Sequence, residues 1–271
     1  MRGPAPAKIN LALVVGPLGS EGKHELLTVY QRVGLADRID VDPADRVSVD
    51  GFAGDTVVRD ALELLAARAD GGRAWRATIE KRVPVAAGLG GGSSDAATAL
   101  RLANTTLAEP LSEAELHAVA AAVGADVPFF LVDGPQLGSG DGTTLRPLEL
   151  PQDFWVLLVL PHDAHKSSTA SVYAAFDERD GAEGWEERRS ALLDALDGVR
   201  RPRDLAALPP NDLAASPVAD ELRALGAFRA DVSGAGPTVY GLFHHRERAR
   251  AAQRAAKRLG RSWLTVPAWY G

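Results

Sequence analysis

Cysteine is absent from the chain, and its absence excludes several kinds of chemistry together. Disulfides, thiolate zinc sites and cysteine nucleophiles all require it. Any metal would therefore be held by oxygen or imidazole ligands. His162 and His165 lie three residues apart, but no third candidate ligand is near them in the sequence, so we assign no metal ligand.

An apolar run of membrane-spanning length is also absent. Pro4 and Pro6 interrupt the stretch where a secretory signal has an uninterrupted apolar helix, so we expect a cytoplasmic protein with no membrane partner. The 271 residues, 46% of them hydrophobic, suffice for one large domain or two moderate ones. A formal charge of -6 argues against nucleic acid as the main partner.

The spacing of apolar residues predicts helices and strands in an irregular order, which favours two α+β domains over a doubly wound sheet. We expect strands over 7–15, 38–51 and 75–85 and helices over 55–70, 94–108 and 112–123. The Gly- and Pro-rich passage GSGDGTTLRPLELPQD then places a domain boundary near 148, between domains 1–147 and 148–271. The second domain has predicted strands over 154–160, 229–233 and 237–243 and a helix from 246.

The first strand brings two polar residues together. Strand alternation predicts that Lys8 and Asn10 lie on one face. The opposite face is then apolar, with Ala7, Ile9, Leu11, Leu13 and Val15. Lys8 and Asn10 are therefore expected to address the same ligand.

The stretch PVAAGLGGGSSDAATAL, residues 84–100, has four glycines within five positions. Glycines let backbone N–H groups converge on one point, and a helix starting near Ser94 adds free N–H groups and the positive end of its dipole. This geometry suits a phosphate. Neither a Walker A loop nor a G-x-G-x-x-G motif is present, so the residues alone leave a phosphate site and a simple turning loop equally open.

The segment PVAAGLGGGSSDAAT resembles the ATP-phosphate loop of the GHMP kinases, the family of galactokinase, homoserine kinase and mevalonate kinase. The segments PAKINLALVV with EGKHELLTVYQ, GADVPFFL and SGAGPTVYGLF are similar, in the same order, to a branch that phosphorylates a methylerythritol carrying a cytidine diphosphate. The resemblance implies a two-domain α+β fold, with an N-terminal domain like domain 2 of ribosomal protein S5 and a ferredoxin-like C-terminal domain.

The resemblance also implies a reaction. The γ-phosphoryl of ATP would move, with Mg²⁺, to the 2-hydroxyl of this small-molecule substrate, a step of the non-mevalonate route to isoprenoid precursors. In-line transfer needs a positioned hydroxyl, a group that accepts its proton and positive charge on the transferring oxygens. Lys8 and Asp126 match the family's catalytic pair. By themselves, Lys8 would be read as a solvated strand lysine and Asp126 as a turn residue.

Binding residues are carried over in the same way. The ATP-binding residues implied are Pro84, Val85, Ala86, Ala87, Gly88, Leu89, Gly90, Gly91, Gly92, Ser93 and Ser94. The substrate-binding residues implied are Asn10, Lys23, His24, Tyr173 and Gly234. Gly234 lies in a glycine turn that also reads as a plain hairpin.

Two positions depart from the family's pattern. Lys23 stands where an aromatic residue usually stacks on cytosine, so Tyr173 is left as the expected stacking residue. Ala86 and Ala87 replace two glycines, and alanine restricts those positions mainly to negative φ. We therefore expect the phosphate contacts chiefly from residues 88–94. Asp95 is expected to complement the helix dipole and is not chosen as a base.

Three alternatives stay open at this stage. The chain could be a GHMP kinase that acts on another small alcohol, or a nucleotide-binding module without catalysis. A nucleic-acid protein is a more distant possibility, because the basic run 246–261 has Ala249, Ala252, Ala255, Ala256 and Leu259 at helical spacing. Its arginines are then the solvated face of a helix. No obligate protein partner is expected.

Overall fold

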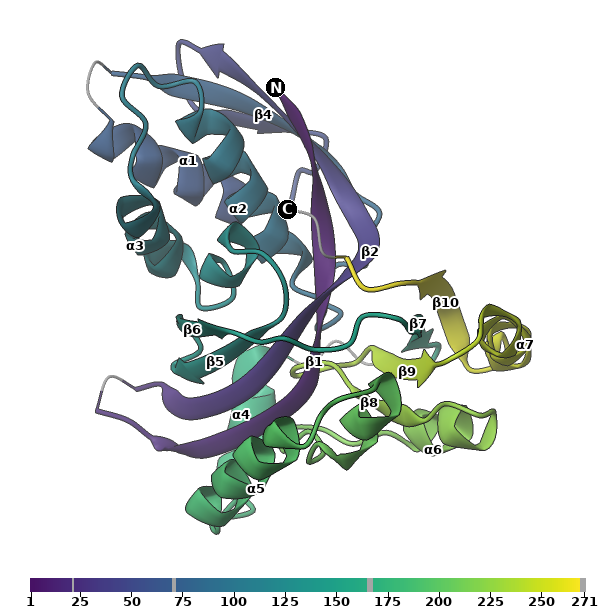
Figure 1. Cartoon of the computed structure of the whole chain (residues 1–271). Helices are drawn as coiled ribbons and strands as arrows, with labels where there is room; N and C mark the ends of the chain where they lie inside the picture. Colours follow the sequence, from purple (N-terminus) through teal and green to yellow (C-terminus); the bar gives the residue numbers. More distant parts are fainter. Residues whose placement is uncertain (21, 70–71, 165–167, 269–271) are drawn as a thin grey trace.

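The structure is a computed structural model that describes residues 1–20, 22–69, 72–164 and 168–268. Two β-sheets and the helices packed on them make up this part of the chain (Figure 1). The first sheet has six strands in the order β3-β4-β2-β5-β6, with β1 also paired on β2. The strands are β1 (Arg2–Leu18), β2 (His24–Ala44), β3 (Ser48–Asp50), β4 (Ala74–Glu80), β5 (Gln136–Gly140) and β6 (Thr144–Pro147).

β1 and β2 form a long antiparallel ribbon that passes along both halves of the molecule (Figure 1). Their pairing shifts between Asn10 and Ala12. Such a bulge adds a residue to one strand and turns the side chains that follow to the opposite face. Leu11 and Ala12 accordingly pack in the same core, whereas Leu13 and Val15 pack in a different cluster. The prediction that the odd-numbered residues share one face is therefore wrong beyond Leu11.

Three helices pack on one face of the first sheet: α1 (Val57–Arg68), α2 (Gly91–Asn104) and α3 (Glu113–Val123), followed by the 3-10 helix η1 (Pro128–Leu131). α3 begins where predicted, because the Ser112 hydroxyl accepts from the Glu115 amide while the Glu115 carboxylate accepts from the Ser112 amide. α2 begins at Gly91 and ends at Asn104. The predicted span 94–108 therefore lies too far along the chain, and the last glycines of the loop belong to the first turn of the helix.

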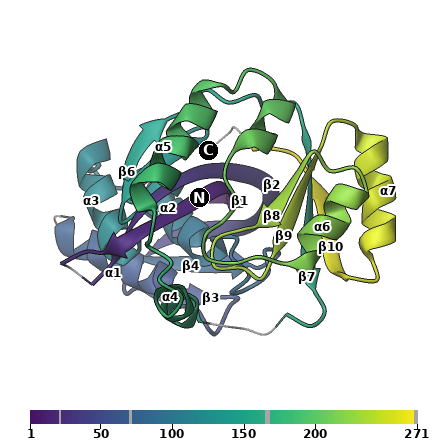
Figure 2. The ribbon, with the colours of Figure 1, turned by 90° about the horizontal axis from the view of Figure 1, so that it is seen from below.

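The second sheet has four antiparallel strands in the order β10-β7-β9-β8. They are β7 (Trp155–Pro161), β8 (Arg229–Val232), β9 (Val239–Phe243) and β10 (Gly260–Thr265). α6 (Pro217–Ala224) and α7 (Arg246–Ala256) cover one face of this sheet (Figure 2). The chain order β7-α6-β8-β9-α7-β10 is the ferredoxin-like arrangement, so that expectation is confirmed. Between β7 and α6 lie α4 (Thr169–Asp177), α5 (Trp185–Asp197) and η2 (Pro202–Ala207).

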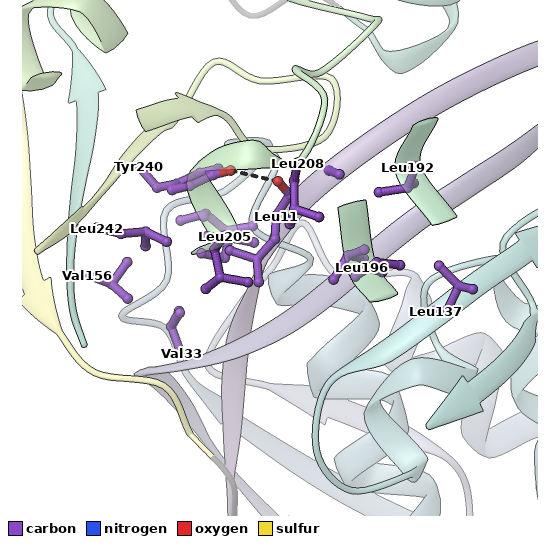
Figure 3. Close-up of a cluster of buried hydrophobic side chains, with 14 of the residues drawn as sticks. Leu11, Val33, Leu137, Val156, Leu192, Leu196, Leu205, Leu208, Tyr240 and Leu242 are labelled. Carbon is purple, nitrogen blue, oxygen red and sulfur yellow. Dashed lines mark hydrogen bonds between the residues drawn. The ribbon is translucent and has the colours of Figure 1, made fainter. Parts of the chain in front are cut away.

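The second sheet is buried on both faces. Leu157 and Val159 of β7 point toward α6 and α7, while Val156 and Leu158 point toward the first half of the chain. This double burial explains why β7 reads as a continuous apolar run. On the inner face, side chains from both sheets and α5 form one core, in which the Tyr240 hydroxyl donates to the Leu11 carbonyl at 3.1 Å (Figure 3).

Some elements differ from the sequence predictions. The passage 138–153, expected as a boundary, contains part of the β5–β6 hairpin, because Gly140 and Gly142 take positive φ in its turn. β10 was not expected, although it pairs with β7 along its length. α7 buries Ala249, Ala252 and Ala256 as predicted, but Ala255 is exposed. The chain passes from the first sheet to the second between Pro147 and Trp155. The domain boundary at 147/148 stays a prediction.

Candidate active site

A cavity of about 1030 Å³ opens between the glycine loop (residues 84–93), the β1–β2 ribbon and α4. Residues from both halves of the chain line it. The candidate residues at its wall are Lys8, Asn10, Lys23, His24, the loop residues 84–93, Asp126, Tyr173 and Gly234. Ser94 is the exception, since it lies fully buried behind the loop. The structure therefore brings together residues that are far apart in the sequence.

The glycine loop is held by backbone contacts that exclude side chains. Gly88 has φ +76°, and a Cβ there would lie 2.3 Å from the Ser233 carbonyl oxygen. The Ser233 hydroxyl donates to the Gly88 carbonyl at 2.9 Å, which ties the loop to the turn after β8. Gly90 has φ +66° and ends the loop at the start of α2. Only glycine fits these two positions without strain.

The start of α2 faces the cavity with unbonded amides. The first bond of the helix runs from the Ser94 amide to the Gly90 carbonyl, at 2.9 Å. The amides of Gly91, Gly92 and Ser93 precede it and have no carbonyl partner within the helix. All three residues line the cavity. These amides and the positive end of the helix dipole make this wall suitable for an anion.

Ala86 differs from the expectation for an alanine in this loop. Its φ is +51°, in the left-handed region, so the sequence-based restriction to negative φ is wrong here. Ala87 is buried, and its carbonyl accepts from the Thr238 amide at 3.2 Å. The loop therefore takes the shape of a glycine loop even with alanine at position 86, at a cost of about 1 kcal/mol.

Lys8 and Asp126 meet at the wall of the cavity. Lys8 is 4% exposed, and its Nζ lies 3.2 Å from Asp126 Oδ2 and donates to Asn10 Oδ1 at 2.6 Å. The Lys8 stem lies beside Gly90, where a Cβ would come within 3.0 Å of Lys8 Cγ. The loop glycine thus makes room for the lysine. Lys8 and Asn10 share a face, as predicted from strand alternation.

A chain of hydrogen bonds fixes Asn10. Its Nδ2 donates to Thr28 Oγ1 at 2.8 Å, and the Thr28 hydroxyl donates to the Ala12 carbonyl at 2.8 Å. A Cβ at Gly234, which has φ +58°, would lie 3.2 Å from Asn10 Oδ1 and 3.3 Å from Lys8 Nζ. Gly234 therefore closes the cavity around these polar groups without a side chain of its own.

His24 and Tyr173 lie together at one end of the cavity. Their rings stack with centroids 5.1 Å apart and an interplanar angle of 25°. His24 Nδ1 lies 2.9 Å from the Gly16 carbonyl oxygen, so it carries the proton in the neutral ring. Its Nε2 lies 3.4 Å from Asp177 Oδ1. Burial raises the pKa of Tyr173 to about 12, with the charge of Asp126 adding to the effect, so this phenol stays neutral.

Lys23 makes an ion pair across the same end. Its Nζ lies 2.6 Å from Asp141 Oδ2 in the β5–β6 turn. The Asp141 carboxylate also accepts from the Thr143 amide and hydroxyl. Although partial burial opposes it, the hydrogen bonds from Lys23 and Thr143 lower the pKa of Asp141. Lys23 thus links the turn between β1 and β2 to the turn between β5 and β6.

A buried cluster of charged residues lies next to the glycine loop. Lys81 Nζ lies 2.5 Å from Asp37 Oδ2 and 2.8 Å from Asp95 Oδ2. Asp37 also accepts from the amide of Val83 at 2.8 Å, just before the loop. Burial, together with the charge of Asp37, raises the pKa of Asp95 to about 8, because one ammonium cannot neutralise two buried carboxylates. Asp95 therefore ties α2 to β4, beyond the helix-dipole role expected for it.

Several of these residues were not singled out from the sequence. Thr28 and Tyr30 lie within the quoted segment EGKHELLTVYQ, and their alternation on one face of β2 was the available signal. Lys81 and Asp37 gave no comparable signal, because charged residues in ordinary strand patterns are read as solvated. Their pairing depends on contacts between β2, β4 and α2.

Within the described ranges, no group of three or more His, Asp or Glu side chains is placed to hold a metal ion. His165 lies outside the described residues, so the His162–His165 pair is not described. Ser93 lines the cavity, and Ser94 Oγ is buried without a hydrogen-bond partner. The site therefore fits a Mg²⁺ ion that arrives with phosphate oxygens and water as its main ligands. No helix in the described part of the chain has the length and apolar character needed to cross a bilayer.

Comparison with known proteins finds two matching families. Residues 56–134 match GHMP kinases N terminal domain, and residues 213–262 match GHMP kinases C terminal. The 4-diphosphocytidyl-2-C-methyl-D-erythritol kinase of Pelobacter propionicus is 38% identical over 281 residues, covering 97% of this chain and 96% of the relative. The enzyme of the same name from Leifsonia xyli is 38% identical, covering 87% and 85%.

Solved structures agree with these matches. A crystal structure of 4-(cytidine 5'-diphospho)-2C-methyl-D-erythritol kinase aligns with a TM-score of 0.78 and 31% identity, over 99% of each chain. A crystal structure of mevalonate kinase aligns with a TM-score of 0.75 over 98% of this chain and 99% of its own. That second structure is 12% identical and shares the fold alone.

Proposed function

The chain belongs to the GHMP kinase family, among relatives named 4-diphosphocytidyl-2-C-methyl-D-erythritol kinase, and on this basis we propose its substrate and mechanism. It is an ATP-dependent kinase that moves the γ-phosphoryl of ATP to the 2-hydroxyl of 4-(cytidine 5'-diphospho)-2-C-methyl-D-erythritol, giving the 2-phosphate and ADP. This step belongs to the non-mevalonate route to isoprenoid precursors. A non-catalytic nucleotide-binding module is thereby disfavoured.

The observation that carries the mechanism is the position of the Lys8–Asp126 pair. Lys8 lies beside Gly90 at the start of α2, and the charge of its partner Asp126 acts on Tyr173 on the other side. A phosphate bound at the amides and a base bound beside the rings of His24 and Tyr173 would leave the acceptor hydroxyl near Asp126. The cavity is thus divided into a donor end, a reacting centre and an acceptor end.

Asp126 accepts a hydrogen bond from the acceptor hydroxyl in this proposal and takes its proton as the phosphoryl group moves. Its side chain is 31% exposed, so a substrate can reach it. Lys8 contributes positive charge next to the transferring oxygens, where charge builds up in a loose transition state. Asn10 holds the Lys8 ammonium through Oδ1 and keeps it aimed at the centre.

The loop amides from Gly88 to Ser93 hold the phosphates of ATP, and loop residues 84–87 line the same cavity as Phe52 and Val57. Mg²⁺, when bound with ATP, would neutralise phosphate charge, and Ser93, which lines the cavity, could offer its hydroxyl to the ion, whereas Ser94 is buried. Among the described residues, no group of three carboxylate or imidazole side chains is placed to bind the ion. Mg²⁺ would therefore be held mainly by the nucleotide.

Lys23, His24 and Tyr173 form the acceptor end. We assign base recognition to His24 and Tyr173, and a phosphate or base contact to Lys23, which the Asp141 pair holds at the rim. Gly234 lets the substrate approach Asn10 and Lys8 closely. All of these residues come from one chain, which supports activity without an obligate protein partner. The cytoplasm is the proposed compartment, in agreement with a chain that has no cysteine.

The decisive experiment measures ADP release by the purified protein with Mg-ATP and one acceptor at a time. The acceptors are 4-diphosphocytidyl-methylerythritol, homoserine, mevalonate and galactose. Release with the cytidine compound alone is the expected result. Release with another acceptor would keep the GHMP kinase assignment and reject the substrate. Mass spectrometry of the product identifies the phosphorylated compound.

A further inference from the structure

Tyr30 lies beside the reacting centre but has no role in the mechanism above. It stands on β2, is 2% exposed and lines the cavity. Its ring stacks on Phe129, with centroids 4.8 Å apart and an interplanar angle of 25°. Its hydroxyl donates to Asp126 Oδ1 at 3.0 Å. The hydroxyl therefore meets the carboxylate oxygen that Lys8 leaves free.

Two glycines fix the ring in this place. A Cβ at Gly138 would lie 2.5 Å from Tyr30 Cε2, and a Cβ at Gly142 would lie 2.9 Å from the Tyr30 hydroxyl. The β5–β6 hairpin thus packs against Tyr30 without side chains at these points. Such close packing leaves the ring little room to move, so the hydroxyl has a fixed direction.

The Tyr30 hydroxyl keeps its proton at neutral pH and is therefore a hydrogen-bond donor. Burial raises its pKa well above the usual value, and the nearby Asp126 charge adds to the effect. A neutral phenol has one proton to give, and Asp126 Oδ1 is the acceptor within reach. The Lys8 ammonium lies 5.7 Å from the centre of the same ring, so ring and hydroxyl both border the catalytic pair.

We propose that Tyr30 is a positioning residue for Asp126. A carboxylate held through one oxygen can rotate about its Cβ–Cγ bond. Tyr30 holds Oδ1 while Lys8 contacts Oδ2, and the two contacts together fix the plane of the carboxylate. A fixed plane keeps a lone pair aimed at the acceptor hydroxyl, which raises the fraction of bound complexes in reactive geometry. This inference rests on the proposed role of Asp126.

The test is Tyr30→Phe, which removes the hydroxyl and keeps the ring. We expect kcat to fall about tenfold, because a hydrogen bond to a charged group is lost. KM for ATP and for the cytidine acceptor should stay within about twofold, since neither ligand loses a contact. Turnover is expressed per ATP-binding site, measured by titration, so that an inactive or unfolded fraction does not lower the result.

Two further variants separate positioning from general damage. Tyr240→Phe removes the hydroxyl of a buried tyrosine that bonds to Leu11 in the core, away from the cavity, and should leave kcat unchanged. In the Asp126→Asn background, Tyr30→Phe should cause no further loss of kcat, because the group that it positions is already gone.

The outcomes distinguish this inference from the proposed function. Wild-type kcat in Tyr30→Phe, or an equal tenfold loss in both backgrounds, would overturn the positioning role and leave the role of Asp126 intact. Near-normal turnover in Asp126→Asn would overturn the role of Asp126, and the positioning role with it.

Discussion

The Asp126 carboxylate should be needed for turnover and not for ATP binding. In Asp126→Asn the proton acceptor is lost, so kcat should fall on the order of a hundredfold or more. The Kd for ATP should change little, because the loop amides proposed to hold the phosphates are untouched. Steady-state kinetics and nucleotide titration measure the two effects. Asp153→Asn, at an exposed carboxylate outside the cavity lining, is the matched control and should keep wild-type kcat.

Lys23 should affect the acceptor and not the nucleotide. Lys23→Ala breaks the pair with Asp141 and removes a cation from the acceptor end. An exposed ion pair contributes up to about 1 kcal/mol, so KM for the cytidine acceptor should rise about two- to fivefold while KM for ATP stays the same. A double-mutant cycle with Asp141→Asn tests whether the two residues act together. Additive effects on KM would contradict a shared role.

Some single-residue features were predictable and others were not. Strand alternation is local, so it correctly placed Lys8 and Asn10 side by side. The resemblance of short motifs pointed to Asp126 and the glycine loop. The Lys23–Asp141 and Tyr30–Asp126 contacts join segments that are far apart in the chain, and no local pattern indicates which partner each side chain meets.

At the scale of elements, the glycine loop is packed against the turn after β8. Gly88→Ala would place a Cβ against the Ser233 carbonyl in a left-handed conformation, so the free energy of unfolding should fall by more than about 2 kcal/mol. Gly92→Ala is the control: Gly92 lies in the first turn of α2 with its nearest neighbour 3.7 Å away. The free energy of unfolding of the Gly92→Ala variant should rise by up to about 1 kcal/mol. Urea unfolding of both variants measures the contrast, and similar losses in the two would contradict it.

The Lys81 cluster joins β2, β4 and α2, and it should make stability depend on pH. The pKa of Asp95 is raised to about 8 in the folded chain, whereas an unfolded aspartate titrates near its usual value of about 3.9. Between these values the folded state binds more protons than the unfolded state, so stability falls as pH rises. Asp95→Asn removes this dependence. As pH rises from 5 to 8, the free energy of unfolding of the variant should therefore increase relative to that of wild type by up to about 1.4 kcal/mol per pH unit. Chemical unfolding at several pH values measures this, and parallel stability curves for the two proteins would contradict it.

The elements that the sequence predicted share a physical reason. α1 and α7 have amphipathic spacing, and the start of α3 is marked by the capping box at Ser112. The sequence did not predict β10 or the β5–β6 hairpin. The residues of β10 show no strong alternation of apolar and polar side chains, and the hairpin is rich in glycine. Glycine usually indicates a loop, but Gly138 lies within strand β5, where the Tyr30 ring leaves no room for a side chain.

For the whole molecule, the core in Figure 3 joins the two sheets. Leu11 and Val33 of the first sheet pack with Val156 and Leu242 of the second. Fragments 1–147 and 148–271 would each expose this surface to water. We expect neither to fold alone, with near-ultraviolet circular dichroism lacking the signal of packed aromatic residues. A cooperative unfolding transition in either isolated fragment would show instead that the proposed boundary separates independent domains.

The bulge between Asn10 and Ala12 has a consequence for how this chain tolerates insertions and deletions. Lys8 and Asn10 face the cavity in one phase of the strand, whereas Leu13, three positions beyond Asn10, faces it in the other. Removing one residue here would restore simple alternation but turn either Lys8 and Asn10 or the residues that follow the bulge to the wrong side. Substitutions at single positions change one contact. A change in length changes every contact on one side of the bulge, so this short stretch should keep its length even where its residues vary.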